Sequence, residues 1–573
     1  ASDIKTFLGG NGSKEVTVNV APVSGQSTTV DFTNAKNIVD GATYAVNVEA
    51  LSANAANDAF QFSNITEKGK ETLGSVKLSL TQIKDGIATD VKEFDEDGGY
   101  VTVSTYIDTG LTGDISVVYN GEGSDPTVIS YNSSKGILTF KTNHFSEFFI
   151  VRDGNVKNEN QNRYYYSLED AINKANTNET IVLQKPLKIE KTISINKDIN
   201  IDLGGNNNGI TSDSSRVFLI IDGTTTIDNG AITSTLNVDL VENTNYSTSS
   251  TIRVSSNDSS NANPRLIIEK DATIKAGNSY GVGAFGKSAS AAVDVYGTIE
   301  AYYSALAGNG SLDWQNQDVE FNVYEESKLI SKASSAIYQP NNGVTNIFGG
   351  SIEGNSAIEI RSGKLNIESG VLKSNASKYE VVSNKSGSTT EGAAIAIAQH
   401  TTRLPINVNI VGGEFSGVVA FSEKDPQDGE AKDITINITG GKFTSTDKSE
   451  NKQTVVSDDI KGFISGGEFD NKPADDYIAD GYFYSNGKIA KVQGTVNVNG
   501  EEIKIANISD VADIESKNIT VDVEKDSSLT LDNGFFNEEN NNGNSKDISL
   551  IGKLDSNDNP VSTVDVITNA VTA

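Results

Sequence analysis

The chain has 573 residues, a formal net charge of −31, no cysteine and no methionine, and its hydrophobic fraction of 36% is low for a globular protein. Its length exceeds what one compact core usually holds, and 52 glycines with long Asn, Ser and Thr stretches indicate thin cores and many turns. The acidic balance argues against nucleic acid and anionic membrane surfaces as partners. The lack of cysteine excludes disulfides and thiol chemistry, and no apolar run is long enough to predict a membrane-spanning helix.

The sequence begins Ala1-Ser2-Asp3, with the small residues that remain after a secretory signal peptide is removed, although an arbitrary boundary would look the same. We therefore expect a secreted protein that acts outside the cell or on its surface. An acidic surface of this kind suits a medium that contains Ca²⁺, because this ion prefers carboxylate and carbonyl oxygens. The alternative is that the charge serves solubility alone.

Residues 1–153 alternate apolar and polar side chains in short runs, as in residues 16–20 and 101–107. A period of two is typical of strands with one buried face. The runs 127–131 and 137–140, separated by turn residues, predict a hairpin. We expect this region to form a β-sandwich-like domain.

Residues 154–178 are predicted to form a linker and a capping helix. The segment 156–162 is polar and poor in apolar residues, as linkers are. Apolar residues then fall at helical spacing over 165–176, and Ser167 followed by Asp170 approximates a capping box. One short amphipathic helix is therefore expected before the next domain.

Residues 179–490 contain a repeat in which an alternating strand meets a turn, often a glycine pair, and a second short apolar pair follows, as in 345–352 and 408–415. The second turn position is glycine in five copies, which lie 20, 43, 28 and 26 residues apart. Periods of about 20 to 50 residues are typical of stacked solenoid units, in which glycine permits a tight corner. The predicted fold class is therefore all-β, with a right-handed parallel β-helix in this region; an array of β-sandwiches is the alternative. The five glycines are Gly350, Gly370, Gly413, Gly441 and Gly467.

Residues 491–573 are predicted to be a β-rich C-terminal segment. Alternating runs at 495–498, 519–523 and 561–567 predict strands, and 537–544 is a polar break. These strands either close the lower end of the β-helix or serve assembly by pairing with a neighbouring subunit.

Several segments resemble parallel β-helix proteins of the cell surface and surface layer (S-layer) of Gram-positive, clostridia-like bacteria. They are the stretch from Ser167 to Gly205, the GGEF and GGKF turns at 412–415 and 440–443, and the aromatic segment 481–487. The hairpin region that ends in HFSEFFIV is similar to β-sandwich modules of the same proteins. The resemblance implies a β-helix and an extracellular location. Such proteins serve as adhesins, as filament or surface-layer components and as polysaccharide binders, and the matching motifs are structural.

Parallel β-helices also host polysaccharide lyases and hydrolases, which need paired carboxylates or a basic residue among several acids on one face. The adjacent acids at 458–459 and 475–476 have no basic cluster beside them, and Arg361 and Arg403 are expected to be solvated surface charges. The two histidines are far apart in the sequence and are expected to pack or to form hydrogen bonds. We therefore expect no catalytic activity.

Two acidic turns are candidate Ca²⁺ sites. Asp95 and Asp97 lie in a turn between predicted strands, and Asp555, Asn557 and Asn559 offer oxygen atoms at alternating positions, as the first half of an EF-type loop does. Both turns lack the distal bidentate glutamate, so plain turns are the alternative. No other cofactor is predicted.

Tyr302, Tyr303 and Trp314 are a candidate platform for a glycan, because flat aromatic faces suit sugar rings. A tryptophan that is buried or anchors a loop is the alternative.

The rod-like repeat, the acidic surface and the strand-like termini together favour an extracellular structural surface protein. We expect it to be the subunit of a filament, appendage or surface layer that self-associates through its ends. One alternative is a polysaccharide-binding adhesin that contacts a glycan or a host surface, and another is a polysaccharide lyase or hydrolase.

Overall fold

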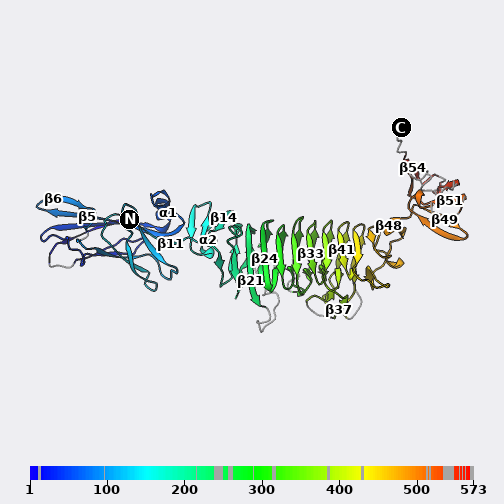
Figure 1. Ribbon diagram of the computed structural model, residues 1–573, viewed down its shortest axis with the longest axis horizontal. Coiled ribbons are helices and arrows are strands. Elements are labelled where there is room, and N and C mark those ends of the chain that lie inside the picture. Colours follow the sequence, from blue (N-terminus) through cyan, green and yellow to red (C-terminus); the bar gives the residue numbers. More distant parts are fainter. Residues whose placement is uncertain are drawn as a thin grey trace. The chain divides into compact units, whose positions relative to one another are not determined.

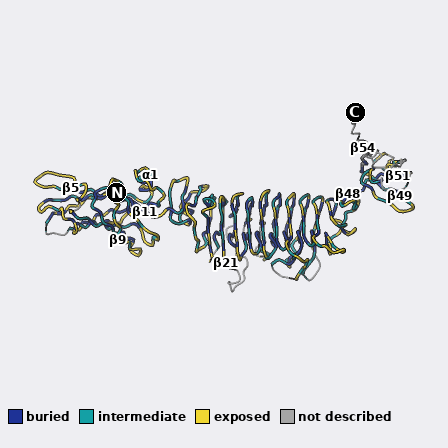
Figure 2. Tube along the Cα trace, in the orientation of Figure 1, coloured by how far each residue is buried: buried dark blue, intermediate teal, exposed yellow. Residues whose placement is uncertain are grey.

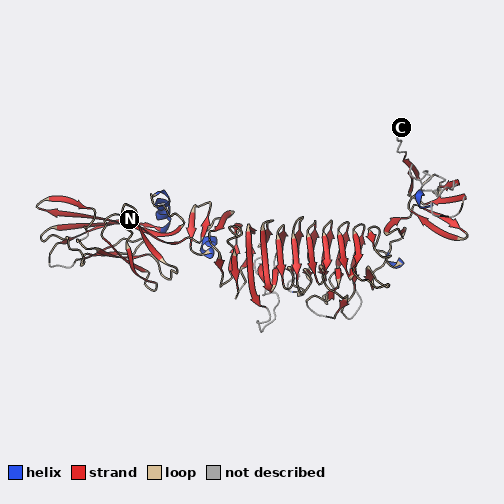
Figure 3. Cartoon of the chain, viewed as in Figure 1, coloured by secondary structure: helices blue, strands red, loops and turns tan. Residues whose placement is uncertain are grey.

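The computed structural model is all-β, with many strands and few helices, as the sequence predicts (Figure 3). The chain divides into two compact units, residues 1–188 with 197–210 and residues 189–196 with 211–573, which are described one at a time. The structure describes the whole chain except residues 11–13, 96, 214–215, 238–249, 256–261, 288, 313–317, 384–386, 428–431, 512–513, 515, 517, 533–546, 554, 558, 562 and 568–573.

In the first unit, residues 1–153 form two antiparallel sheets that contribute to one core. Alternation directs one side of each strand into this core, so that every second residue of β4 (Thr43–Ser52) is buried. The predicted hairpin is present as β9 (Thr127–Asn132) and β10 (Ile137–Thr142). One sheet has the order β1 (Ser2–Leu8), β4, β5 (Lys70–Lys84), β11 (Glu147–Asp153) and β8 (Ile115–Tyr119), with β6 (Ile87–Val91) paired to β5. The other has the order β2 (Glu15–Val18), β3 (Thr28–Asp31), β7 (Val101–Tyr106), β10 and β9.

Helix α1 (Ala53–Phe62) packs against the sheet that contains β11 (Figure 1). Neighbouring residues of a strand point to opposite faces. Phe148 therefore enters the sandwich core, whereas Phe149 packs against Phe60 of the helix with 5.3 Å between ring centres.

The polar segment that was expected to be a linker is folded. β12 (Val156–Asn158) pairs antiparallel with β13 (Arg163–Tyr165) and with β14 (Glu179–Leu183). Nδ2 of Asn158 donates to Oε2 of Glu179 at 2.7 Å, and both side chains are buried. The linker prediction is therefore wrong here, because the polar side chains hydrogen-bond to one another instead of to solvent.

Helix α2 (Leu168–Lys174) begins as the sequence predicts. The backbone N–H of Asp170 donates to Oγ of Ser167 at 3.1 Å and so caps the first turn. After the helix, β14 pairs in parallel with β17 (Ile199–Asp202), and β15 (Leu187–Lys188) lies between them in the chain.

A buried ion pair attaches this segment to the sandwich within the first unit. Nε of Arg152 lies 2.6 Å from Oε2 of Glu71, which also accepts the backbone N–H of Tyr166 at 3.0 Å. The guanidinium of Arg152 covers the ring of Tyr166 at 4.7 Å. The segment that leads into helix α2 is therefore fixed to the sandwich by a charge that is shielded from water.

The second unit contains three long parallel sheets, and successive strands of the chain enter them in turn (Figure 1). We call one strand in each sheet a round. Sheet 1 has the order β20 (Thr224–Asp228), β23 (Arg265–Ile268), β26 (Ala291–Val295), β29 (Val319–Val323), β32 (Gly343–Ile347), β35 (Gly363–Ile367), β40 (Ile406–Ile410) and β43 (Ile434–Ile438). Sheet 2 has the order β18 (Ile210–Ser212), β21 (Gly230–Asn237), β24 (Ala272–Asn278), β27 (Thr298–Ala301), β30 (Lys328–Ser331), β33 (Ser351–Gly354), β36 (Val371–Ser374), β41 (Glu414–Gly417), β44 (Lys442–Ser445) and β46 (Glu468–Phe469). Sheet 3 has the order β16 (Ile193–Asn196), β19 (Phe218–Asp222), β22 (Ser250–Ser255), β25 (Tyr280–Phe285), β28 (Leu306–Ala307), β31 (Ile337–Gln339), β34 (Ile358–Ile360), β39 (Ala393–Ile397), β42 (Val419–Glu423) and β45 (Val455–Ser457).

The strands of each sheet are in register, so like side chains stack in columns. Ile347, Ile367, Ile410 and Ile438 are successive partners in sheet 1, and all are buried. Figure 2 shows that buried segments recur from one round to the next. In sheet 2, Phe443 stacks between Phe415 and Phe469, with ring centres 4.6 and 4.7 Å apart. Each round thus covers the apolar surface of the round before it.

Asparagines form a second kind of column, on the outward face of sheet 1. Nδ2 of Asn346 donates to Oδ1 of Asn322 at 2.9 Å, and Nδ2 of Asn366 donates to Oδ1 of Asn346 at the same distance. Asn409 and Asn437 continue the series at 3.2 and 3.1 Å. We call these five residues the amide ladder; the sequence analysis did not anticipate it.

The connections between the sheets differ in length. Those from sheet 1 to sheet 2 have at most four residues, from β20 to β44. Those on either side of sheet 3 vary more, from one residue between β24 and β25 to eighteen between β36 and β39, where the connection has a small hairpin of its own, β37 (Glu380–Val381) and β38 (Thr390–Glu391). The strands of sheet 3 from β22 onward are mostly buried on both faces, as in β39 and β42.

After the rounds, β48 (Lys488–Lys491) pairs antiparallel with β46 and with β47 (Tyr482–Ser485), where a closing segment was expected. The C-terminal strands then form a sheet with the order β50 (Glu501–Ile505), β49 (Gly494–Val498), β51 (Asn518–Val523) and β53 (Asp547–Ile551). β52 (Ser528–Asp532) pairs in parallel with β54 (Thr563–Ile567). Val496, Ile505, Val521 and Leu529 share a core there, which gives this segment a packed interior of its own. Two short 3₁₀ helices, η4 (Asp475–Tyr477) and η5 (Ile508–Val511), complete the elements.

Candidate functional site

The turns from β32 to β33, β35 to β36, β40 to β41 and β43 to β44 each have three residues and end in a glycine with positive φ. A Cβ on Gly412 would lie 2.3 Å from the carbonyl oxygen of Glu368, which is closer than atoms can approach. The next residue, Gly413, has φ +104°, in the left-handed region that favours glycine. The predicted role of the glycine repeat as a series of tight corners is therefore confirmed.

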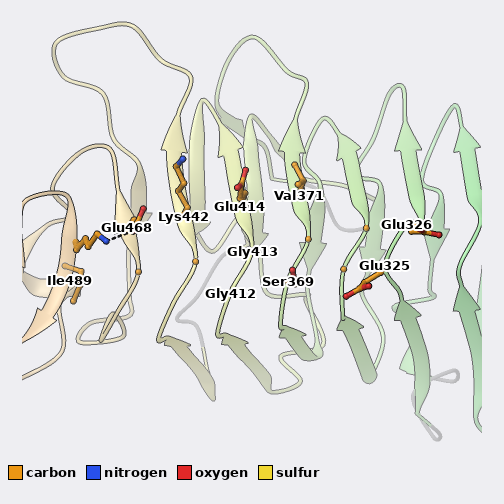
Figure 4. Close-up of a pocket in the computed structure, with 16 residues that line it drawn as sticks. Glu325, Glu326, Ser369, Val371, Gly412, Gly413, Glu414, Lys442, Glu468 and Ile489 are labelled. Atoms are coloured by element: carbon orange, nitrogen blue, oxygen red, sulfur yellow. Dashed lines mark ion pairs between the residues drawn. The ribbon is translucent and has the colours of Figure 1, made fainter. Parts of the chain in front are cut away.

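These turns line an open groove, which we call the glycine groove (Figure 4). Its floor has almost no side chains, and Ser369 and the half-exposed Val371 interrupt the glycines. Charged residues line both ends, as Figure 4 shows. The lining residues are Glu325, Glu326, Gly349, Gly350, Ser369, Gly370, Val371, Gly412, Gly413, Glu414, Gly441, Lys442, Gly467, Glu468, Lys488 and Ile489.

Ion pairs stand at both ends of the groove. At one end Oε2 of Glu326, next to Glu325, lies 2.7 Å from Nζ of Lys270. At the other end Nζ of Lys488 lies 2.8 Å from Oε1 of Glu468, and this hydrogen bond lowers the pKa of the Glu468 carboxyl. Glu414 and Lys442 stand on adjacent strands of sheet 2, so acid and base alternate there.

The groove floor offers backbone hydrogen-bond donors. The carbonyl oxygens of Gly350 and Gly413 accept the N–H groups of Val371 and Lys442, each at 2.8 Å, and so link neighbouring rounds. The N–H groups of Gly350 and Gly413 themselves, however, donate no hydrogen bond to any described residue. An open groove with free N–H groups and mixed charges can bind an oxygen-rich chain, and it contains no histidine, serine–base pair or isolated buried acid for chemistry.

The candidate Ca²⁺ turns do not gather ligands. Asp95 and Asp97 are both exposed, and the carbonyl of Asp95 accepts the N–H of Gly98 at 2.9 Å, as in an ordinary turn. Oδ1 of Asp555 accepts the N–H groups of Asn557 and Asn559 at 2.7 and 2.9 Å, and these backbone bonds lower the pKa of the Asp555 carboxyl. In the described part of the chain, no group of three or more acidic or histidine side chains is arranged to hold a metal ion.

The candidate aromatic platform is described in part. Tyr303 stacks on Tyr280 with 5.2 Å between ring centres, and Tyr302 meets Tyr303 edge-on at 5.0 Å. One face of Tyr303 is thus occupied, while Tyr302 is 38% exposed. Trp314 lies outside the described residues.

Sequence reasoning missed a buried polar layer on sheet 3. Arg361 was expected to be a solvated charge, but it is fully buried, and its Nε and Nη1 donate to the carbonyls of Ala398 and Gly387 at 3.1 and 3.0 Å. Two residues earlier, the buried carboxylate of Glu359 accepts the N–H and the hydroxyl of Thr389 at 2.8 and 2.7 Å. Gly387 and Thr389 belong to the connection from β36 to β39, so this connection covers sheet 3 and is attached to it by both charges.

Arg403, also expected to be solvated, is partly buried and paired with Asp425. His400 is buried beside this layer, and burial, with the nearby charge of Arg361, lowers its pKa to about 4. His144 stacks on Tyr119 at 4.5 Å and lies 3.3 Å from Glu93, in agreement with a packing and hydrogen-bonding role.

The adjacent acids also have structural partners. The N–H groups of Asp458 and Asp459 both donate to Oε2 of Glu423 at 3.1 Å, and burial raises the pKa of the Glu423 carboxyl. Asp475 and Asp476 each face a lysine at 2.7 Å. The available signal for the buried layer was the run Ala393–Ile397, whose side chains are all apolar and therefore suit a strand covered on both faces.

No family model matches this chain, and no curated protein and no solved structure matches it either. Among the described residues, no helix has both the length and the hydropathy needed to cross a membrane.

Proposed function

We propose that this chain is an extracellular structural protein, the subunit of a filament, appendage or surface layer, without catalytic activity. We further propose that the rounds of residues 179–490 form a right-handed parallel β-helix, which acts as a stiff spacer. The three in-register parallel sheets and the short glycine turns between sheets 1 and 2 support this architecture.

The amide ladder is the observation that carries the spacer proposal. It joins Asn322, Asn346, Asn366, Asn409 and Asn437 by side-chain hydrogen bonds, in addition to the backbone bonds of the sheet. Stacked rings and apolar columns cross the same boundaries between rounds. Because these boundaries are crossed by side-chain contacts as well as by backbone bonds, bending there would break more than one kind of contact at once.

The test is electron microscopy with light scattering on the purified full chain, with and without Ca²⁺. Assembly should produce ordered polymers, and divalent cations should favour them because the net charge of −31 opposes close approach of subunits. Particles that remain monomeric in every condition would contradict a role as an assembling subunit.

The second candidate is a polysaccharide-binding adhesin, and the glycine groove favours it. Its free N–H groups and open floor suit a linear chain of hydroxyl groups. Ser369 is exposed in this groove, so Ser369→Trp should block the groove at little cost in stability. The matched control is Lys373→Trp, at an exposed position of sheet 2 that does not line the groove. A glycan array should then show binding by the control and none by Ser369→Trp. An array on which the unmodified chain binds nothing would remove this candidate.

A further inference from the structure

The outward face of sheet 1 has a neutral region in an otherwise acidic chain. We consider the outward side chains of β32, β35, β40 and β43, together with the residue that follows each strand. Two of them are charged, Lys364 and Glu368, and their charges are opposite. The other outward side chains there are uncharged. We call this region the amide face because Asn346, Asn366, Asn409 and Asn437 run through its centre.

The amides of this face have hydrogen-bonding capacity that the ladder does not use. An asparagine amide has two N–H groups and an oxygen that can accept two bonds. Asn346 and Asn366 each donate one bond to the ladder and accept one from it, which leaves one N–H on each without a partner in the described part of the chain. The oxygen of Asn437 accepts no bond from any described residue, and this side chain is exposed.

The ladder also fixes where these free groups lie. Each amide plane is held by its neighbours, so the free groups repeat at the strand spacing of about 4.8 Å. Val411 lies in the same strip, two residues after Asn409, and is 58% exposed. The face therefore combines a row of donors and acceptors with an exposed apolar side chain.

We infer that the amide face binds a neutral, hydroxyl-rich glycan chain that lies across the rounds. This rests on the polysaccharide-binding candidate above, specifies its ligand class and adds a second contact face beside the glycine groove, where Val411 directly precedes Gly412. A sugar hydroxyl both donates and accepts, as an amide does, and the apolar side of a sugar ring can cover Val411. An acidic polymer finds no excess of positive charge on this face and is repelled by the net charge of the chain.

The experiment is isothermal titration calorimetry of the full chain with cellohexaose and mannohexaose as neutral probes and tetragalacturonate as the acidic probe. At least one of the two neutral probes should bind. Tetragalacturonate should bind more weakly than that neutral probe. Asn366→Leu should weaken this binding about tenfold, since it removes hydrogen-bonding groups at the centre of the face. Asn437→Leu should also weaken it, and this exposed ladder end can be changed with little effect on folding, which a thermal melt checks. Lys373→Leu, on sheet 2, should bind as the unmodified chain does.

Each other result overturns the inference in a distinguishable way. If Asn366→Leu and Asn437→Leu bind normally but Ser369→Trp does not, the glycan lies in the glycine groove, so the adhesin candidate stands and the amide face does not bind it. If no probe binds the unmodified chain, both fail. If tetragalacturonate binds most tightly, the ligand class is wrong. If Asn437→Leu changes the oligomeric state and leaves glycan binding intact, the face is a contact between copies.

Discussion

The glycine turns between sheets 1 and 2 and the polar layer on sheet 3 are built from the same rounds but differ in almost every property. Between β32 and β44 these turns all have three residues, are open to solvent and end in glycine. The polar layer holds buried charges such as Glu359 and Arg361, and the connections on either side of sheet 3 range from one residue between β24 and β25 to eighteen between β36 and β39. The difference shows that a repeat can keep one corner constant while another side accepts insertions, provided that each insertion satisfies the polar groups that it buries.

The largest loss of stability should come from a change in the buried polar layer of sheet 3. Glu359→Ala should lower the free energy of unfolding by about 4 kcal/mol, because the N–H and hydroxyl of Thr389 lose their acceptor in a site shielded from water. Chemical denaturation of the full chain measures this. The matched control is Glu414→Ala in the glycine groove, which is exposed and should change stability by less than about 0.5 kcal/mol. Equal effects would remove the distinction between the two regions.

The next largest effect is a pH-dependent loss of stability that involves His400. Its pKa of about 4 in the folded chain lies below the usual value near 6.5, so its contribution to stability is intact above pH 6.5. As pH falls from 6.5 to 4, the unfolded chain binds a proton that the folded chain does not, and about 3 kcal/mol is lost. Unfolding of His400→Gln, measured at both pH values, should lack this part of the loss. An unchanged pH profile would mean that this histidine does not titrate in that range.

At the glycine turns, Gly412→Ala should destabilise the chain by about 2 kcal/mol, because the added Cβ meets the carbonyl of Glu368. Ser369, which holds the corresponding position one round earlier, already carries a Cβ, so Ser369→Ala should have almost no effect. Thermal unfolding of the two variants compares them directly. A neutral Gly412→Ala would show that the turn can relax.

The smallest loss of stability is expected for substitutions in the amide ladder. Asn366→Ala interrupts it and should cost about 1 kcal/mol, while Asn437→Ala removes only the terminal bond and should cost about half as much. Denaturant midpoints measure both. Equal values for the two variants would show that the second ladder bond of Asn366 adds nothing to stability.

The sequence predicted the glycine turns because their information is local. A positive φ and a close backbone contact restrict the residue type at fixed places in each round, and these restrictions are visible as a repeat around Gly350, Gly413 and Gly441. The alternation of strand residues likewise indicated the buried columns and the all-β class. The capping of α2 by Ser167 was predictable for the same reason.

The buried polar layer could not be predicted in this way. Residues 358–361 alternate like a strand with one solvated face, and only the position of a connection that returns across sheet 3 decides that Arg361 is buried. Residues 156–162 were misjudged for a related reason, because their polar side chains have partners such as Glu179 that lie elsewhere in the sequence. The amide ladder became visible only when the register aligned asparagines that are between 20 and 43 residues apart.

The register of the rounds has a consequence for how such a protein changes over generations. Neighbouring rounds from β32 to β43 contact one another through the same columns of isoleucine and asparagine in sheet 1. A duplicated or deleted round would therefore meet matching neighbours on both sides, and the chain would gain or lose about 4.8 Å of length with its interior unchanged. The length of the stack of rounds can therefore change in small, equal steps.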